Sequence, residues 1–122
     1  MSSSQPEQRL QDIIDNIDWI SSDILDMSID QFIADRKTQD AVLFCVLRIS
    51  EAAKKLGDLG EAMIPNQEWH AIRSIGNYLR HEYDFVDNYQ IWKTITEDLP
   101  QLRFDCENAL SQVRLKPNDG KE

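Results

Sequence analysis

The stretch Ala41–Ile49, AVLFCVLRI, constrains the fold more than any other part of the chain. It is followed by the helix-forming run SEAAKKLG, and Thr38 or Asp35 is a suitable residue to begin a helix that Gly57 would end. A helix that is apolar on nearly every side must be covered on nearly every side. We therefore expect this segment at the centre of a helical bundle, or shared with a second subunit.

Amphipathic helical periodicity extends over much of the remaining chain. Ser28 is a good N-cap for a short helix, and Pro100 fits the first turn of a final helix. The expected helices before the final one cover residues 8–27, 29–34, 67–85 and 89–97, in addition to the helix that Gly57 would end. Neither the two-residue alternation of strands nor an internal repeat is present. The sequence predicts an all-α fold, an antiparallel bundle of four to five helices.

Length and charge limit what such a bundle does. The chain has 122 residues, enough for one core, and a formal net charge of −9. An acidic chain is poorly suited to coating nucleic acid, which requires many lysines and arginines, but it can still carry a local basic cleft. We expect a disordered leader over residues 1–7, one domain over residues 8–115 and a flexible tail over residues 116–122.

Other features argue against a membrane protein or a metalloprotein. No apolar run approaches the length of a membrane span, and the start MSSSQPEQ has no apolar signal region, so a cytoplasmic protein is expected. Cys45 and Cys106 lie in apolar helical patterns and are expected as buried free thiols. Without CxxC or HxxxH spacing, no metal or other cofactor is expected.

The segment Ile72–Asp84, IRSIGNYLRHEYD, gathers several reactive side chains on one expected helix. At 100° per residue, the polar face centred on Arg73 extends about 80° to either side. Its other members are Gly76, Asn77, Arg80, His81 and Tyr83. Glycine costs about 1 kcal/mol in a helix interior, so Gly76 predicts a close approach by another helix, a second subunit or a ligand. Mixed polar faces are commonly only solvated, so spacing alone names no reaction.

Two long stretches carry a family resemblance. They are DQFIADRKTQDAVLFCVLRISEAAKKLG and IPNQEWHAIRSIGNYLRHEYDFVDNYQIWKTITEDLPQL. In order and spacing they resemble the HepT-like proteins of the HEPN superfamily, and the similarity covers Leu10 to Leu115. The resemblance implies a dimerising bundle of four to five helices.

The same resemblance implies a function. Active HepT-like proteins are metal-independent endoribonucleases, the toxins of type VII toxin–antitoxin modules, and their partner is an MntA-type nucleotidyltransferase antitoxin. Both subunits contribute to a composite cleft, and the signature is an arginine, four to six residues, a histidine, one residue and a tyrosine. His81 and Tyr83 match this signature, which makes Tyr83 the implied target of AMPylation.

The arginine of the signature has no counterpart at the usual position, where Gly76 stands. Seven residues separate Arg73 from His81, and Arg80 adjoins it, so either arginine is a candidate.

In the predicted reaction His81 does acid/base work, because an imidazole exchanges protons near neutral pH. Arg80 or Arg73 stabilises the phosphorane, Asn77 orients the imidazole or binds phosphate, and Tyr83 positions RNA. The alternative is a non-catalytic HEPN subunit that binds a nucleotidyltransferase and cuts no RNA.

Overall fold

The computed structural model describes residues 5–115, and within that range all regular structure is helical, as predicted. The elements, in order, are α1 (Pro6–Asp23), α2 (Ile29–Ile33), α3 (Arg36–Leu56), α4 (Asp58–Met63), α5 (Trp69–Glu82), the 3-10 turn η1 (Tyr83–Phe85), α6 (Asn88–Lys93), the π-helical segment η2 (Thr94–Asp98) and α7 (Leu99–Leu115). The expected tail and most of the expected leader lie outside the described residues.

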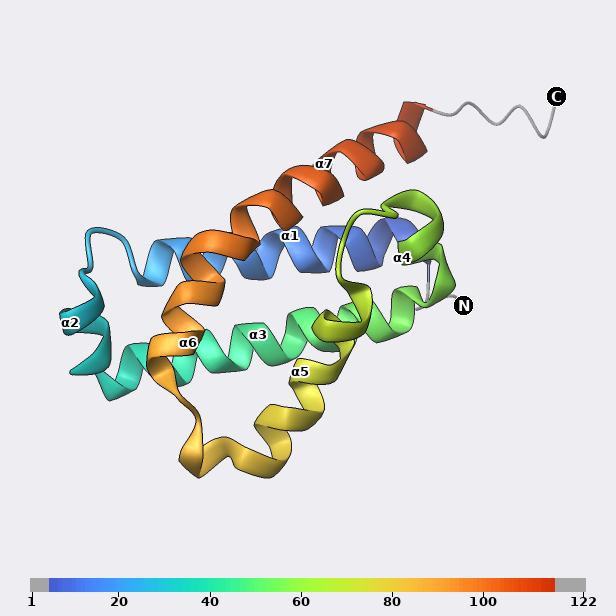
Figure 1. The fold of residues 1–122 in the computed structure, drawn as a ribbon. Coiled ribbons are helices and arrows are strands. Elements are labelled where there is room, and N and C mark those ends of the chain that lie inside the picture. The colour runs from blue at the N-terminus through green and yellow to red at the C-terminus, as the bar shows by residue number, and fades with distance from the viewer. Residues whose placement is uncertain (1–4, 116–122) are drawn as a thin grey trace, which may run out of the picture.

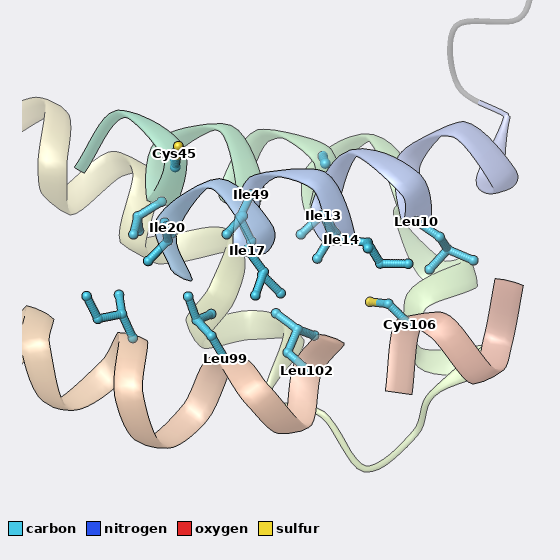
Figure 2. Packing of buried hydrophobic residues seen from close by; sticks show 14 of the residues in the cluster. Leu10, Ile13, Ile14, Ile17, Ile20, Cys45, Ile49, Leu99, Leu102 and Cys106 are labelled. Atoms are coloured by element: carbon cyan, nitrogen blue, oxygen red, sulfur yellow. The ribbon is translucent and has the colours of Figure 1, made fainter. Parts of the chain in front are cut away.

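Three helices enclose most of the core. α1 and α3 lie side by side and run in opposite directions, and α7 crosses the other side of α1 (Figure 1). Figure 2 shows the isoleucines of α1 between apolar side chains of α3 and α7. Labelled there are Leu10, Ile13, Ile14, Ile17 and Ile20 of α1, Cys45 and Ile49 of α3, and Leu99, Leu102 and Cys106 of α7. Each large apolar side chain buried in this way contributes about 1.5–3 kcal/mol to folding.

The helix expected at the centre of the bundle is α3, which packs against both α1 and α5. Asp35 caps its first turn by accepting a hydrogen bond of 3.1 Å from the Thr38 N–H, and Gly57, with a φ of +62°, ends it. The hydrogen bonds from Thr38 hold the pKa of the Asp35 carboxyl below its usual value. α3 is not covered on every side, however, because the side chain of Phe44 is 57% exposed.

α5 meets α3 at a very close crossing. Ser50 is completely buried, and its hydroxyl donates to the Arg73 carbonyl oxygen at 2.9 Å and accepts from the Gly76 N–H at 3.1 Å. A Cβ atom on Gly76 would lie 2.5 Å from the Ser50 Oγ. Of the three predicted reasons for Gly76, the structure supports the approach of another helix.

The last part of the chain differs from the prediction in one respect. The expected helix over residues 89–97 and the final helix form one run, because η2 joins α6 to α7 without a break. Pro100 lies in the first turn of α7, as predicted. Across the described residues, none of the helices combines the length and apolar character of a membrane span.

Candidate functional site at the end of the fifth helix

The candidate site lies at the C-terminal end of α5, where four of the side chains predicted for it are exposed. Asn77, Arg80 and His81 are on the last two turns of the helix, and Tyr83 begins η1 directly after it. Helical spacing keeps these side chains close, while Leu79 points into the core and anchors the turn. Among the described residues His81 has no hydrogen-bond partner, so its imidazole is free to meet a substrate.

Cations from two helices meet at Asn77. Its side-chain oxygen accepts from the Arg80 Nη1 at 3.2 Å and, more weakly, from the Lys54 Nζ of α3 at 3.5 Å. The Arg80 Nη2 also donates to the Glu51 carboxylate at 2.9 Å, and both side chains of this ion pair are nearly half exposed. An exposed ion pair is held by about 1 kcal/mol or less. A phosphate group can therefore replace Glu51 as the partner of the Arg80 guanidinium.

Tyr83 is bound to α3 as well. Its hydroxyl donates a short hydrogen bond of 2.6 Å to the Asp40 Oδ1, and the other oxygen of Asp40 lies 3.4 Å from the Arg36 Nη1. The hydrogen bond to the Asp40 carboxylate raises the pKa of Tyr83, because the carboxylate disfavours a phenolate beside it. Desolvation of the phenol raises this pKa further, although half of the Tyr83 side chain is exposed.

An open groove runs beside this contact, between α3 and the end of α5, and encloses about 370 Å³. Its walls are Asp40, Leu43, Phe44 and Leu47 of α3, Leu79 and Arg80 of α5, and Tyr83 of η1. Four of these side chains are apolar, and the others are one acid, one cation and one phenol. Such a surface suits a flat apolar group that bears charge at one end.

Arg73 is directed elsewhere. Its guanidinium donates to both oxygens of the Glu61 carboxylate in α4, at 2.6 and 2.9 Å, and to the Gly57 carbonyl oxygen at 3.0 Å. This ion pair raises the pKa of Arg73 and lowers that of Glu61. The structure therefore brings Asn77, Arg80, His81 and Tyr83 to one end of α5, and it ties Arg73 to the junction of α3 and α4.

Sequence reasoning missed the α3 side of the site, which consists of Asp40, Glu51 and Lys54. A signal was present, because eleven residues from Asp40 to Glu51 are about three helical turns and place both on one face. That this face lies against α5 follows only from the Ser50–Gly76 crossing. Within residues 5–115 no group of three His, Cys, Asp or Glu side chains is arranged to hold a metal ion.

Comparison with known proteins places this chain in a family. The family model described as "Ribonuclease HepT-like" matches residues 10–109. A probable ribonuclease HepT of Thermococcus cleftensis is 32% identical over 94 residues, which cover 77% of this chain and 86% of that protein. The putative RNase MJ0127 of Methanocaldococcus jannaschii is 34% identical over 105 residues, which cover 85% of this chain and 86% of that protein.

A second protein of that organism, the putative RNase MJ1380, is 25% identical over 107 residues, which cover 88% of this chain and 98% of that protein. No solved structure gives a significant match. With a family model spanning most of the chain and relatives matched over most of their lengths, this chain belongs to the HepT-like ribonuclease family.

Proposed function

We propose that this chain is the toxin of a type VII toxin–antitoxin module, a cytoplasmic endoribonuclease that cuts RNA without a metal ion. The observation that carries the proposal is the exposure of His81 and Arg80 side by side at the end of α5, next to Asn77 and Tyr83. Membership of a ribonuclease family supports the same reaction.

The chemistry follows from these side chains. In cleavage by a ribose hydroxyl, the 2′-oxygen attacks phosphorus, a base takes its proton, and the departing 5′-oxygen receives a proton from an acid. His81 serves as base or acid, and Arg80 stabilises the charge that develops on the phosphorane oxygens. Asn77, bonded to Arg80, orients that guanidinium. Tyr83 lies on the groove wall, where it can position the RNA.

Arg80 is the better choice for the phosphate-binding arginine. Its only carboxylate partner among the described residues is Glu51, in an exposed pair that exchanges readily with water or phosphate. Arg73 is three-quarters buried and bound to Glu61 and to a backbone carbonyl, so using it in catalysis would dismantle the junction of α3 and α4.

The proposed site is shared by two copies of the chain. One chain supplies a single histidine to this region, whereas cleavage needs both a base and an acid, and two copies of His81 in a symmetric dimer would supply both. The side chain of Phe44 on α3 is more than half exposed. Burying this side chain against a second copy, with Tyr83 left accessible, would stabilise such a dimer.

The proposed partner is an MntA-like nucleotidyltransferase antitoxin, which transfers an adenylyl group to Tyr83. Half of the Tyr83 side chain is exposed, so its hydroxyl is accessible to a second protein. The adenylyl phosphate would add bulk and negative charge to the wall that holds Arg80. It would therefore repel an RNA backbone, by the same physics as a phosphorylation.

Induced expression in a bacterial host tests the proposal. Growth and the integrity of total RNA are followed together for the wild type, His81→Ala and His70→Ala, the last being an exposed histidine at the other end of α5. We expect growth arrest with RNA loss for the wild type and His70→Ala, and neither for His81→Ala. Cleavage by the purified protein should persist in EDTA. Arrest by His81→Ala would contradict the proposed mechanism.

A second function is favoured by two observations: position 76 holds no arginine, and Arg80 is paired with Glu51. In this alternative the chain is a non-catalytic subunit that binds a nucleotidyltransferase through the same groove. Intact RNA and healthy growth in every arm of the expression experiment would support it.

A further inference from the structure

We propose that Asp40 accepts the phenol proton when an adenylyl group is transferred to Tyr83. The same transfer breaks the hydrogen bond between Asp40 and Tyr83. The inference rests on the proposed function, in which Tyr83 is the modified residue. It adds a catalytic role for the modified chain itself, in a residue that stands 43 positions upstream on a different helix.

The geometry singles out one phenol among three. Tyr78, Tyr83 and Tyr89 are all about half exposed, so exposure alone would allow any of them to be modified. Of these three phenols, all within the described residues, that of Tyr83 alone donates a hydrogen bond to a carboxylate, at 2.6 Å. The Asp40 side chain is itself 43% exposed, so a nucleotide can reach the pair from solvent. The carboxylate thus marks Tyr83 as the reactive tyrosine.

The transfer step balances with Asp40 as the base. The Tyr83 Oη attacks the α-phosphorus of a nucleoside triphosphate, which the nucleotidyltransferase holds with Mg²⁺. The Oη–phosphorus bond forms while the bond from that phosphorus to the pyrophosphate oxygen breaks, and pyrophosphate leaves with the electron pair. The phenol proton passes to the Asp40 Oδ1.

The charged groups around the phenol explain why a base is needed. The hydrogen bond to Asp40 raises the pKa of Tyr83, desolvation and the charges of Asp40 and the more distant Asp84 raise it further, and the charge of Arg36 lowers it. A phenolate is therefore not available before the attack, and the proton must move during it. The Arg36 Nη1 lies 3.4 Å from the other Asp40 oxygen, so Asp40 Oδ1 is the oxygen that faces the phenol.

Adenylylation of Tyr83 then breaks its hydrogen bond to Asp40. A tyrosine that carries an adenylyl phosphodiester has no hydroxyl proton to donate, so its hydrogen bond to Asp40 is lost. The new negative charge would also lie beside the Asp40 carboxylate, and like charges at this distance repel. Two cations lie near the phenol: Arg36, whose charge acts on the Tyr83 hydroxyl, and Arg80 on the wall of the same groove. The modified ring should therefore leave Asp40, and its phosphate should pair with one of these two arginines.

The test uses the full chain, a nucleotidyltransferase of the antitoxin class, Mg²⁺ and radiolabelled ATP. Transfer is measured for the wild type, Tyr83→Phe, Asp40→Asn and Asp84→Asn, the last being a neighbouring carboxylate that does not contact the hydroxyl. We expect no transfer to Tyr83→Phe and little change for Asp84→Asn. For Asp40→Asn, kcat should fall about a hundredfold, the scale of general-base catalysis, with KM for ATP little changed.

A second readout separates catalysis from a merely structural role. The rate with Asp40→Asn should rise steadily with pH as solvent removes the phenol proton, and circular dichroism should show an unchanged fold. Equal transfer to wild type and Asp40→Asn would overturn this inference while leaving the proposed modification intact. No transfer to the wild type would overturn the modification itself, and this inference with it.

Discussion

Gly76 and Ser50 stand so close that a Cβ atom on the glycine would lie 2.5 Å from the serine hydroxyl oxygen. By the resemblance described above, Gly76 stands where the HepT-like signature usually has its arginine. An arginine there would begin inside the α3–α5 contact, so in this chain that position is used for packing. In the proposed site the cation is Arg80, one turn later on α5, whose side chain is exposed.

Gly76→Ala should destabilise the fold. Alanine is favoured over glycine in a helix interior by about 1 kcal/mol, but overpacking a close contact costs about 1–3 kcal/mol, and Ser50 is held by two hydrogen bonds. We expect a net loss of free energy of unfolding, measured in urea, with Ser74→Ala on the exposed face as the near-neutral control. Gly76→Arg should be less stable still. A more stable Gly76→Ala variant would contradict this account of the crossing.

Arg73→Ala and Arg80→Ala should fail in different ways. Loss of Arg73 removes hydrogen bonds to Glu61 and to the Gly57 carbonyl, so stability should fall by about 1–2 kcal/mol. At a temperature where this variant is folded, its RNA cleavage should stay within about threefold of wild type. Loss of Arg80 should leave stability nearly unchanged and lower cleavage about a hundredfold or more, the scale of a lost electrostatic contact. The reverse pattern would assign catalysis to Arg73.

Much of the helical framework could be predicted because local signals and tertiary packing agree in it. Ser28 and Gln31 form a complete capping box at α2, and Asp35 and Gly57 bound α3 where the sequence indicated. The predicted end of α5 was less accurate, since the helix stops at Glu82 and the chain continues as a 3-10 turn through Phe85. No capping residue marks that change.

The candidate site could be predicted only on the helix that carries its motif. Spacing placed Arg73 and Arg80 on one face, but it did not reveal that Glu61 draws the Arg73 guanidinium toward α4. The contact of Tyr83 with Asp40 spans 43 positions and depends on how α3 and α5 cross. Such long-range pairs are determined by packing, which local periodicity does not record.

The two thiols should be unreactive in the folded chain. Both cysteines are free and buried, as predicted, and burial raises the pKa of Cys45 and raises that of Cys106 to about 12. At pH 8, titration with Ellman's reagent should detect almost no thiol in the native protein and two per chain in denaturant. Rapid labelling of Cys106 in the native protein would show that the α1–α7 interface opens.

Cys106 should also make the free energy of unfolding fall as pH rises from about 8.5, because the thiol of the unfolded chain then loses its proton before that of the folded chain.

Tyr83 should titrate above the ordinary value for a phenol, and Asp40 should be the reason. The hydrogen bond raises the pKa of Tyr83 in the folded chain, so its stabilisation is complete below about pH 10, the pKa of an unfolded tyrosine. The stabilisation is lost as pH rises through the higher folded pKa, because the phenolate cannot donate to the carboxylate.

NMR of carbon-13-labelled tyrosine, with Tyr83→Phe to assign the signal, measures this titration directly. Asp40→Asn should lower the pKa of Tyr83, because an amide oxygen carries no charge to repel the phenolate. Asp84→Asn should lower it much less, since Asp84 acts only at a distance and is the weakest influence on that phenol. If Asp40→Asn left the titration unchanged, the two side chains would not be in contact in solution, and Asp40 would lose its place in the candidate site.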